Sequence, residues 1–380
     1  MTDLGRDQLL NLDRQLFLAR YWQREPLLIK NAIVDFRTPI SSHELAGLAL
    51  EDAVESRLIE HCDSSWRLLH GPFTESDFLR KSPWTLLVQA VDHYIPEVAA
   101  LRKLMDFIPQ WRVDDVMVSY AVAGGSVGPH YDNYDVFLLQ GEGSRRWQLG
   151  QFCDETSALV PHESLRILRD FVPREEYLLG PGDMLYVPPG VAHWGVAQAE
   201  CTTISIGFRA PRIQDMLSRW VDELLQEMQP DQFYRDDQRA PVTRAGEISP
   251  ADLSRAKTQL QTAMNRFRDT RWFGEVVTEP RDPPSYDGEE IASAHALIKA
   301  GVKIVELRAC SKVAWQEETK DIVVFANGQS RPFNVSILPS LLTLCQNWRL
   351  DAADLTEALA DLETVRLLAY LMENGVVDVQ

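Results

Sequence analysis

Two histidines and one aspartate in this chain have the types and spacing of a metal site. His130 and Asp132 stand two residues apart, and His193 follows 61 residues after Asp132. Residues two apart in a β-strand point to the same face, so a strand would direct this imidazole and this carboxylate together. Two histidines and one carboxylate leave metal positions open for substrate and dioxygen, as in non-haem Fe(II) oxygenases. A solitary His-Asp pair is more often a surface hydrogen bond, so the hypothesis depends on its companions.

Arg145 is such a companion, fifteen positions after His130. Residues 134–140 predict a strand, residues 141–144 a turn, and residues 145–149 the returning strand of a hairpin. The hairpin would bring Arg145 back beside the metal-bearing strand, where its guanidinium fork can hold a carboxylate bidentately. This suits a dicarboxylate co-substrate that chelates the metal by its other end. Strand alternation places Arg145 and Arg146 on opposite faces, so one of them is expected inside; the alternative for Arg145 is a solvated strand residue.

Many short strands surround these residues in the sequence. The approach to His193, residues 180–190, indicates a turn, a short apolar strand and a second turn. Further strands are predicted at 26–30, 84–89 and 115–120, and helices at 9–20 and 42–50. A metal site on strands distributed in this way suits a closed antiparallel barrel whose mouth holds a small ligand. Composition alone predicts only an α+β chain with many short strands.

The middle of the chain is predicted to be helical. Apolar residues recur every three or four positions from Ile213 to Met228, which predicts one amphipathic helix with Trp220 at its centre. A polar loop at 229–247 follows, and Ser249-Pro250-Ala251-Asp252 begins a second helix with Ser249 as its N-cap. The apolar face of this second helix carries Leu253, Leu260, Met264 and Phe267. The two stripes either pack against the chain's own barrel or form a homodimer interface.

A proline-rich linker at 278–286 introduces a third unit. A helix is predicted at 291–300, strands at 302–307 and 321–325, and three helices at 338–345, 352–360 and 362–373. This order is typical of a winged helix, which often binds nucleic acid. From Arg281 onward, however, the chain has nine Lys/Arg against fifteen Asp/Glu, a net charge of −6. Because no basic recognition helix emerges, protein contact or scaffolding is expected instead of DNA binding.

The whole chain is acidic, with 38 Lys/Arg against 56 Asp/Glu and a net charge of −18. A surplus of this sign argues against nucleic acid as the direct partner and fits a basic protein partner. The five cysteines form no C-x-x-C pair, which predicts neither a zinc site nor a disulfide framework, and most are expected to be buried. No signal peptide or membrane span is predicted, so a cytoplasmic location is expected.

The segments GPHYDNYDVFLLQGEGSRRWQLG and LGPGDMLYVPPGVAHWGV resemble the JmjC-type 2-oxoglutarate oxygenases. The similarity is greatest to their bacterial ribosomal oxygenase branch, the arginine hydroxylases of a large-subunit ribosomal protein. Residues 21–30 and 205–211 are similar to the same family. The resemblance covers most of the chain and is strongest at 114–211.

The resemblance implies the fold and the site residues. It implies an α+β fold with a double-stranded β-helix (cupin-like JmjC) barrel at 1–211, a helical dimerisation segment at 212–277 and a winged-helix-like domain at 278–380. Within the barrel, Fe(II) would be bound by His130, Asp132 and His193, and the distal carboxylate of 2-oxoglutarate by Arg145. Ser119, Thr203 and Ser205 are further candidates for 2-oxoglutarate contacts, although strand hydroxyls also often satisfy backbone groups.

The activity that the resemblance implies is hydroxylation of a ribosomal protein side chain, with a basic large-subunit protein as substrate and partner and a homodimer as the assembly. Lysine demethylation is the alternative within the family. Outside it, the alternatives are a non-catalytic cupin-like binding protein and an acidic adaptor for ribosomal proteins. Tyr131, Tyr134 and Asp135 are candidates by sequence proximity to grip a guanidinium, but alternation places Asp135 on the opposite face from Asp132.

Overall fold

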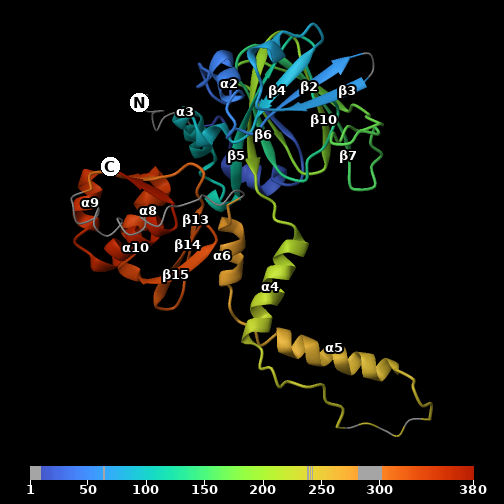
Figure 1. The fold of residues 1–380 in the computed structure, drawn as a ribbon, viewed down its shortest axis with the longest axis vertical. Coiled ribbons are helices and arrows are strands. Elements are labelled where there is room, and N and C mark those ends of the chain that lie inside the picture. The colour runs from blue at the N-terminus through green and yellow to red at the C-terminus, as the bar shows by residue number, and fades with distance from the viewer. Residues whose placement is uncertain (1–9, 63–64, 238, 240, 242, 281–301) are drawn as a thin grey trace.

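The computed structural model describes residues 10–62, 65–237, 239, 241, 243–280 and 302–380. The predicted helix at 291–300 lies outside the described residues. Figure 1 shows a β-barrel, a long two-helix extension below it, and a C-terminal unit beside both. The predicted α+β architecture is confirmed, and the predicted boundaries at residues 211 and 277 stay a prediction.

The barrel is built from two antiparallel sheets. The larger sheet has eight strands in the order β1-β9-β6-β11-β5-β4-β2-β3, and the smaller has three in the order β10-β7-β8. The strands of the larger sheet are β1 (Leu27–Ile29), β2 (Ser56–Cys62), β3 (Ser65–His70), β4 (Trp84–Val88), β5 (Val113–Ala121), β6 (Val136–Gln140), β9 (Met184–Val187) and β11 (Cys201–Phe208). Those of the smaller sheet are β7 (Arg145–Phe152), β8 (Glu175–Leu179) and β10 (Val191–Ala197).

The two faces of the larger sheet pack against different partners. On its outer face, Val118, Ile204 and Phe137 join a core with the N-terminal helical elements. On its inner face, Leu138 and Leu185 pack against Trp147 and Leu149 of the smaller sheet. Successive strand residues point to opposite faces. Residues of odd number in β5 and β11 around Ser119 and Thr203 therefore face the space between the sheets.

The N-terminal elements close the outer face of the larger sheet. They are α1 (Arg14–Leu16), a π-helix (Phe17–Tyr21), α2 (Ser42–Leu48) and α3 (Pro96–Ala99). The helix predicted at 9–20 is confirmed from Arg14 onward, after the Asp13 N-cap. Its second half is a π-helix, in which the Trp22 amide donates to the Phe17 carbonyl. The wider turn lets the fully buried Phe17 meet the ring of Tyr186 edge-on at 4.8 Å.

The extension consists of α4 (Ile213–Glu227) and α5 (Pro250–Met264). The Ser249 hydroxyl accepts the Asp252 amide and the Asp252 carboxylate accepts the Ser249 amide, which confirms the predicted N-cap. Trp220 of α4 packs edge-on against Phe267, with ring centroids 5.9 Å apart. The stripe therefore packs in part within the extension, and Figure 1 shows α4 leading away from the barrel.

Helix α6 (Arg271–Thr278) joins the extension to the C-terminal unit. A Cβ atom on Gly274 would lie 2.4 Å from the Phe325 ring, so only glycine allows α6 to approach the sheet this closely. The unit contains the sheets β13-β14-β15 and β16-β12-β17. Its elements are β12 (Val305–Leu307), β13 (Val313–Glu317), β14 (Asp321–Ala326), β15 (Gln329–Asn334), α8 (Leu338–Asn347), β16 (Arg349–Leu350), α9 (Ala352–Ala358), α10 (Leu362–Glu373) and β17 (Val377–Val379).

None of the five cysteines forms a disulfide in the described part of the chain, but they are more exposed than expected. Cys153 and Cys201 are buried, Cys345 is half-buried, and Cys62 and Cys310 are exposed. Among the residues that the structure describes, no helix combines the length and the apolar character needed to cross a membrane.

Candidate metal centre

A pair of backbone hydrogen bonds brings the two histidines of the motif together. The His130 amide donates to the His193 carbonyl at 3.0 Å, and the His193 amide donates to the His130 carbonyl at 2.8 Å. Residues paired in this antiparallel way present their side chains on the same face. The predicted strand through His130 and Asp132 is wrong, because the pairing is an isolated bridge in an otherwise irregular segment. The Gly190 amide secures that segment by donating to the Asp132 carbonyl at 2.8 Å.

The side chains of His130, Asp132 and His193 converge on one point. Each offers a ligand atom, and these atoms all lie within 4.8 Å of one another. The His193 Nε2 and Asp132 Oδ2 atoms are 3.6 Å apart. Among the described residues, no further histidine, cysteine or carboxylate joins the group. Two imidazoles and one carboxylate therefore form a three-ligand set that leaves the remaining coordination positions open.

Hydrogen bonds to backbone carbonyls fix which nitrogen of each histidine faces the centre. His130 Nδ1 lies 3.0 Å from the Gly128 carbonyl, and His193 Nδ1 lies 3.0 Å from the Val191 carbonyl. A carbonyl only accepts, so each Nδ1 carries the proton and each Nε2 offers its lone pair. In this tautomer Nε2 is free to ligate a metal.

The environment of His193 keeps its imidazole neutral. Burial, reinforced by the nearby His130, lowers the pKa of His193 to about 4, although Asp132 acts in the opposite direction. The distance to Asp132 would permit an ion pair, but the cost of desolvating a charged imidazole prevails because only 2% of His193 is exposed. A neutral imidazole beside a carboxylate is ready to bind a divalent cation.

Arg145 is a buried cation whose guanidinium lacks a full set of acceptors. It lies on the inner face of β7 and is 3% exposed, whereas Arg146 is exposed, as strand alternation predicted. Its Nε and Nη2 atoms have no hydrogen-bond partner in the described part of the chain. Leaving such donors unpaired in a desolvated position is costly. The arrangement therefore fits an anionic ligand that enters the barrel and pairs with Arg145.

Trp147 separates Arg145 from the histidines. Its ring centroid lies 5.8 Å from the Arg145 Cζ and 5.9 Å from the His193 ring. Gly195 pairs with Trp147 across the strands, and a Cβ there would lie 2.8 Å from the indole. Glycine therefore lets the indole lie across β10. The Trp147 Nε1 atom is also buried without a partner among the described residues. It is therefore a second donor that an acceptor on a bound ligand could satisfy.

The candidate hydroxyls line the larger sheet opposite Arg145. Ser119 pairs with Thr203 across β5 and β11, and both are almost fully buried on the inner face. Ser205 follows on the same face of β11 and is 7% exposed. Their hydrogen bonds within the protein are long: the Ser119 hydroxyl donates to the Thr203 carbonyl at 3.4 Å, and the Thr203 hydroxyl donates to Gln140 Oε1 at 3.5 Å.

Tyr131, Tyr134 and Asp135, the candidates for binding a guanidinium, lie in different environments. Asp135 is fully buried and accepts from Tyr186, Gln23 and Arg112, so it belongs to an internal network. Tyr131 is also buried, and its hydroxyl donates to the Asp154 carbonyl at 2.6 Å. Tyr134 is 41% exposed.

Asp115 is an inward-facing carboxylate that the sequence analysis did not identify. The register of β5 against β11 is irregular between Val113 and Val116. A Cβ on Gly207 would lie 3.6 Å from Asp115 Oδ1, which places this carboxylate on the inner face of the sheet. Gln89 donates to Asp115 Oδ2 at 2.6 Å, and the residue is 8% exposed. The only sequence signal was a carboxylate inside an apolar strand.

Two family models match the chain. A JmjC domain matches residues 100–216, and a ROXA-like winged helix matches residues 262–378. The ribosomal protein uL16 3-hydroxylase of Escherichia coli is 36% identical over 375 residues, covering 96% of this chain and 97% of that protein. A probable ribosomal oxygenase of Haemophilus influenzae is 42% identical over 207 residues, covering 53% of this chain and 51% of that protein.

Solved structures extend the similarity to three dimensions. The structure of YcfD, a ribosomal oxygenase from Escherichia coli, in complex with cobalt and 2-oxoglutarate, superposes with a TM-score of 0.79 and 32% identity. The match covers 98% of this chain and 99% of that one. A second structure of the same oxygenase, with cobalt and succinic acid, gives a TM-score of 0.79 and 33% identity.

The first testable prediction concerns the aspartate of the three-ligand set. Asp132→Ala should weaken Co(II) binding by more than the roughly 10- to 100-fold that loss of an outer hydrogen-bond partner costs, because a direct ligand is removed. The fold should persist, since the Asp132 side chain is 23% exposed and lies outside the core. Absorption titration with Co(II) and a thermal melt measure the two effects. Asp170→Ala, at an exposed carboxylate, is the control. Undiminished Co(II) binding by Asp132→Ala would remove Asp132 from the site.

Proposed function

This chain belongs to the JmjC-domain ribosomal oxygenases, and from that membership we propose that it hydroxylates an arginine side chain of a ribosomal protein. Fe(II) and 2-oxoglutarate are the metal and co-substrate of this activity. The observation that carries the proposal is the three-ligand set in the same barrel as a buried, incompletely paired Arg145. When bound, the iron and 2-oxoglutarate supply with dioxygen the oxidising power to convert C–H into C–OH, releasing succinate and carbon dioxide.

The residues of the barrel would hold and orient these groups. His130, Asp132 and His193 would bind the metal, and Arg145 would pair with the distal carboxylate of 2-oxoglutarate. The hydroxyls of Ser119, Thr203 and Ser205 face the same space and would supply weaker contacts. The apolar side chains between the two sheets lower the local dielectric of this interior, which strengthens the charge interactions made there.

Asp115 supports arginine as the target residue. A carboxylate on the inner face of β5 can hold a guanidinium by paired hydrogen bonds, which would orient the side chain of an incoming loop. The relative's name specifies uL16 as its substrate and position 3 as the site, which in an amino acid is the Cβ atom. We extend both to this chain. The net charge of −18 is suited to the approach of a basic ribosomal protein.

Mass spectrometry of uL16 tests this function directly. Purified enzyme, Fe(II) and 2-oxoglutarate should add one oxygen atom to a single arginine of the uL16 from the same cells, with matching succinate formation. Omission of 2-oxoglutarate is the control. Formaldehyde release from methyl-lysine peptides, without oxygen addition to uL16, would support demethylation and overturn the proposal.

Asp115→Asn should weaken recognition of the protein substrate. The change keeps the size of the side chain and removes its charge, so the hydrogen bonds to a guanidinium should lose about 1.5–3 kcal/mol. The KM for uL16 should rise accordingly while the KM for 2-oxoglutarate stays the same. Glu176→Gln, at an exposed carboxylate of β8, should change neither constant. Equal uL16 kinetics in Asp115→Asn and the wild type would exclude this carboxylate as the guanidinium partner.

Replacement of Arg145 should separate co-substrate affinity from folding stability. Arg145→Met should weaken 2-oxoglutarate binding by about 2–5 kcal/mol, because a carboxylate would enter the barrel unpaired. Arg145→Lys should weaken 2-oxoglutarate binding less than Arg145→Met does, since it keeps the positive charge but loses the planar guanidinium fork. The thermal midpoint of the ligand-free Met variant should not fall, because a poorly paired buried cation has been removed. Calorimetric titration and thermal melts measure both, with the exposed Arg146→Met as control. Undiminished affinity in Arg145→Met would assign the carboxylate to another residue.

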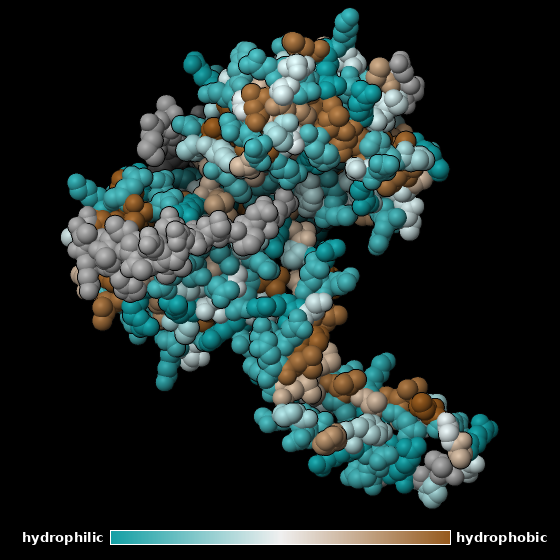
Figure 2. Space-filling view, viewed as in Figure 1, coloured by the Kyte–Doolittle hydropathy of each residue, from teal (hydrophilic) through white to brown (hydrophobic). Residues whose placement is uncertain are grey.

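We also propose that the enzyme is a homodimer joined through α4 and α5. Figure 2 shows apolar side chains gathered along these helices, away from the barrel. Large apolar residues of the extension are strongly exposed: Ile213, Leu217, Leu225, Phe233, Ile248, Leu253 and Leu260 are each more than half exposed. Covering each leucine in an interface would contribute about 1.5–3 kcal/mol. A second copy presents the same strip and can cover it by twofold symmetry.

The double change Leu217→Glu and Leu225→Glu should convert the dimer into a folded monomer. Both side chains are more than half exposed, so the charges oppose association without entering the core. Leu224 is a poor choice because it is buried. Light scattering should report the monomer mass, and the thermal midpoint of the barrel should be retained. The matched double change to Gln should weaken association less. A dimer mass in the double Glu variant would refute this interface.

A further inference from the structure

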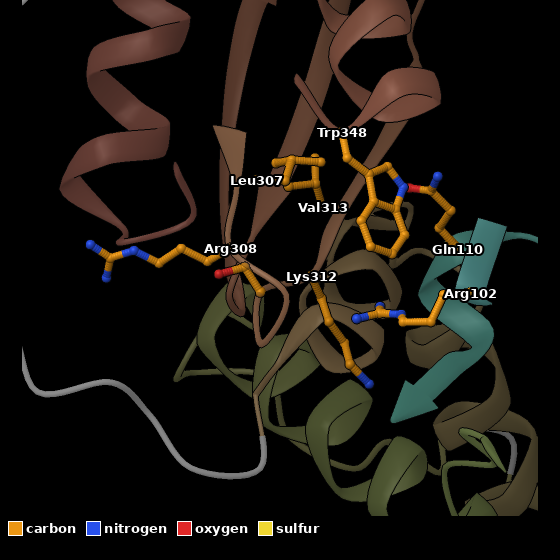
Figure 3. A pocket seen from close by; sticks show the side chains of 8 residues that line it. Arg102, Gln110, Leu307, Arg308, Lys312, Val313 and Trp348 are labelled. Atoms are coloured by element: carbon orange, nitrogen blue, oxygen red, sulfur yellow. The ribbon is translucent and has the colours of Figure 1, made fainter. Parts of the chain in front are cut away.

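The barrel and the C-terminal unit meet at a charged interface. Figure 3 shows Arg102 and Gln110 from the barrel side facing Lys312 and Trp348 of the C-terminal unit. The cavity among them is about 20 Å³, which is enough for a single water molecule and too small for an organic ligand. The contact therefore fixes two parts of the chain against each other.

An ion pair makes the first link across this interface. Lys312 Nζ lies 3.1 Å from Asp114 Oδ1 of β5, and only 7% of the Lys312 side chain is exposed. Buried pairs of this kind hold their geometry because separating them would leave a desolvated charge. The link joins the C-terminal unit to the residue immediately before Asp115.

A relay through Arg102 and Asp92 makes the second link. Arg102 Nη1 donates to the Ala309 carbonyl at 2.6 Å and to Asp92 Oδ2 at 3.1 Å, and its guanidinium lies 4.9 Å from the Trp348 ring centroid. Asp92 is 1% exposed, and its other oxygen accepts the Val116 amide at 2.8 Å. The relay thus ends on the backbone of the residue immediately after Asp115.

Both links converge on the irregular segment of β5, one on each side of Asp115. A bulge redirects side chains and lacks part of the regular ladder, so contacts from outside the sheet must stabilise its shape. We infer that the C-terminal unit positions Asp115 for the protein substrate, with Lys312 and Arg102 as positioning residues. This inference rests on the proposed role of Asp115, and it assigns the C-terminal unit a function in substrate recognition.

The experiment compares Lys312→Met with Arg331→Met in the full-length enzyme. Arg331 pairs with Glu373 inside the C-terminal unit and is the matched control for loss of a cation. In Lys312→Met, hydrogen exchange of residues 113–118 should accelerate and the KM for uL16 should rise by about two- to thirtyfold. The KM for 2-oxoglutarate should stay constant, which a general loss of structure would not allow. Arg331→Met should change none of these values.

A double variant separates this inference from the proposed function. If Lys312 acts through Asp115, adding Lys312→Met to Asp115→Asn should raise the uL16 KM by less than Lys312→Met does alone. Unchanged exchange at 113–118 in a folded Lys312→Met protein would overturn the inference, as would a full additive effect in the double variant. Normal uL16 hydroxylation by Asp115→Asn would instead overturn the proposed role of Asp115, while the exchange measurement still decides whether the links hold β5. Should Lys312→Met fail to fold, Asp114→Asn provides the same comparison.

Discussion

The reciprocal hydrogen bonds between the peptides of His130 and His193 are the constraint on which the site depends. They tie an irregular segment before β6 to the first residues of β10, and so to the smaller sheet. Because the two residues form a direct antiparallel pair, their imidazoles emerge on one side, with ring centroids 4.2 Å apart. Everything else at the centre follows from this pairing: Asp132 arrives two residues later, and backbone carbonyls hold each Nδ1 so that Nε2 faces inward.

The interior between the sheets combines an apolar lining with a few incompletely satisfied polar groups. Leu138, Leu149 and Leu185 give it apolar surface, whereas Arg145 and Trp147 present buried donors. A protein that folds with such donors gives up stability that a bound carboxylate restores, since ligand binding to the native state stabilises it by mass action. The unpaired donors that lower the stability of the ligand-free protein also make the barrel selective for an anionic ligand.

Sequence reasoning predicted the residues of the centre better than the elements that carry them. The spacing of His130, Asp132 and His193 led to the prediction that they group only together with Arg145 and the family resemblance, whereas alternation along 145–149 alone predicted that Arg145 and Arg146 would differ in burial. The predicted strand through His130 was wrong because a bridge between residues distant in sequence replaces regular pairing. Alternation along β5 places Asp115 on the same inner face as Ser119, but a single carboxylate at the start of a predicted strand did not mark it as a site residue. Likewise, the contact of Asp114 with Lys312 joins residues far apart in the chain. Nothing in the sequence around either residue indicates that the two will pair. The barrel topology itself came from family resemblance, because short strands alone do not specify their order.

The position of β1 in the larger sheet has a consequence for biosynthesis. Among the described strands, β1 (Leu27–Ile29) pairs with β9 alone, at residues 184–187, so the N-terminal strand has no such partner until β9 has left the ribosome. At about 5–20 residues per second, synthesis of the intervening chain takes on the order of 10–30 seconds. During this interval the apolar side chains of the nascent N-terminus, with Phe17 among them, lack the surface that finally buries them. Such a topology favours late, cooperative closure of the barrel, and it exposes the unfinished chain to chaperones for longer than a fold built from neighbouring strands would.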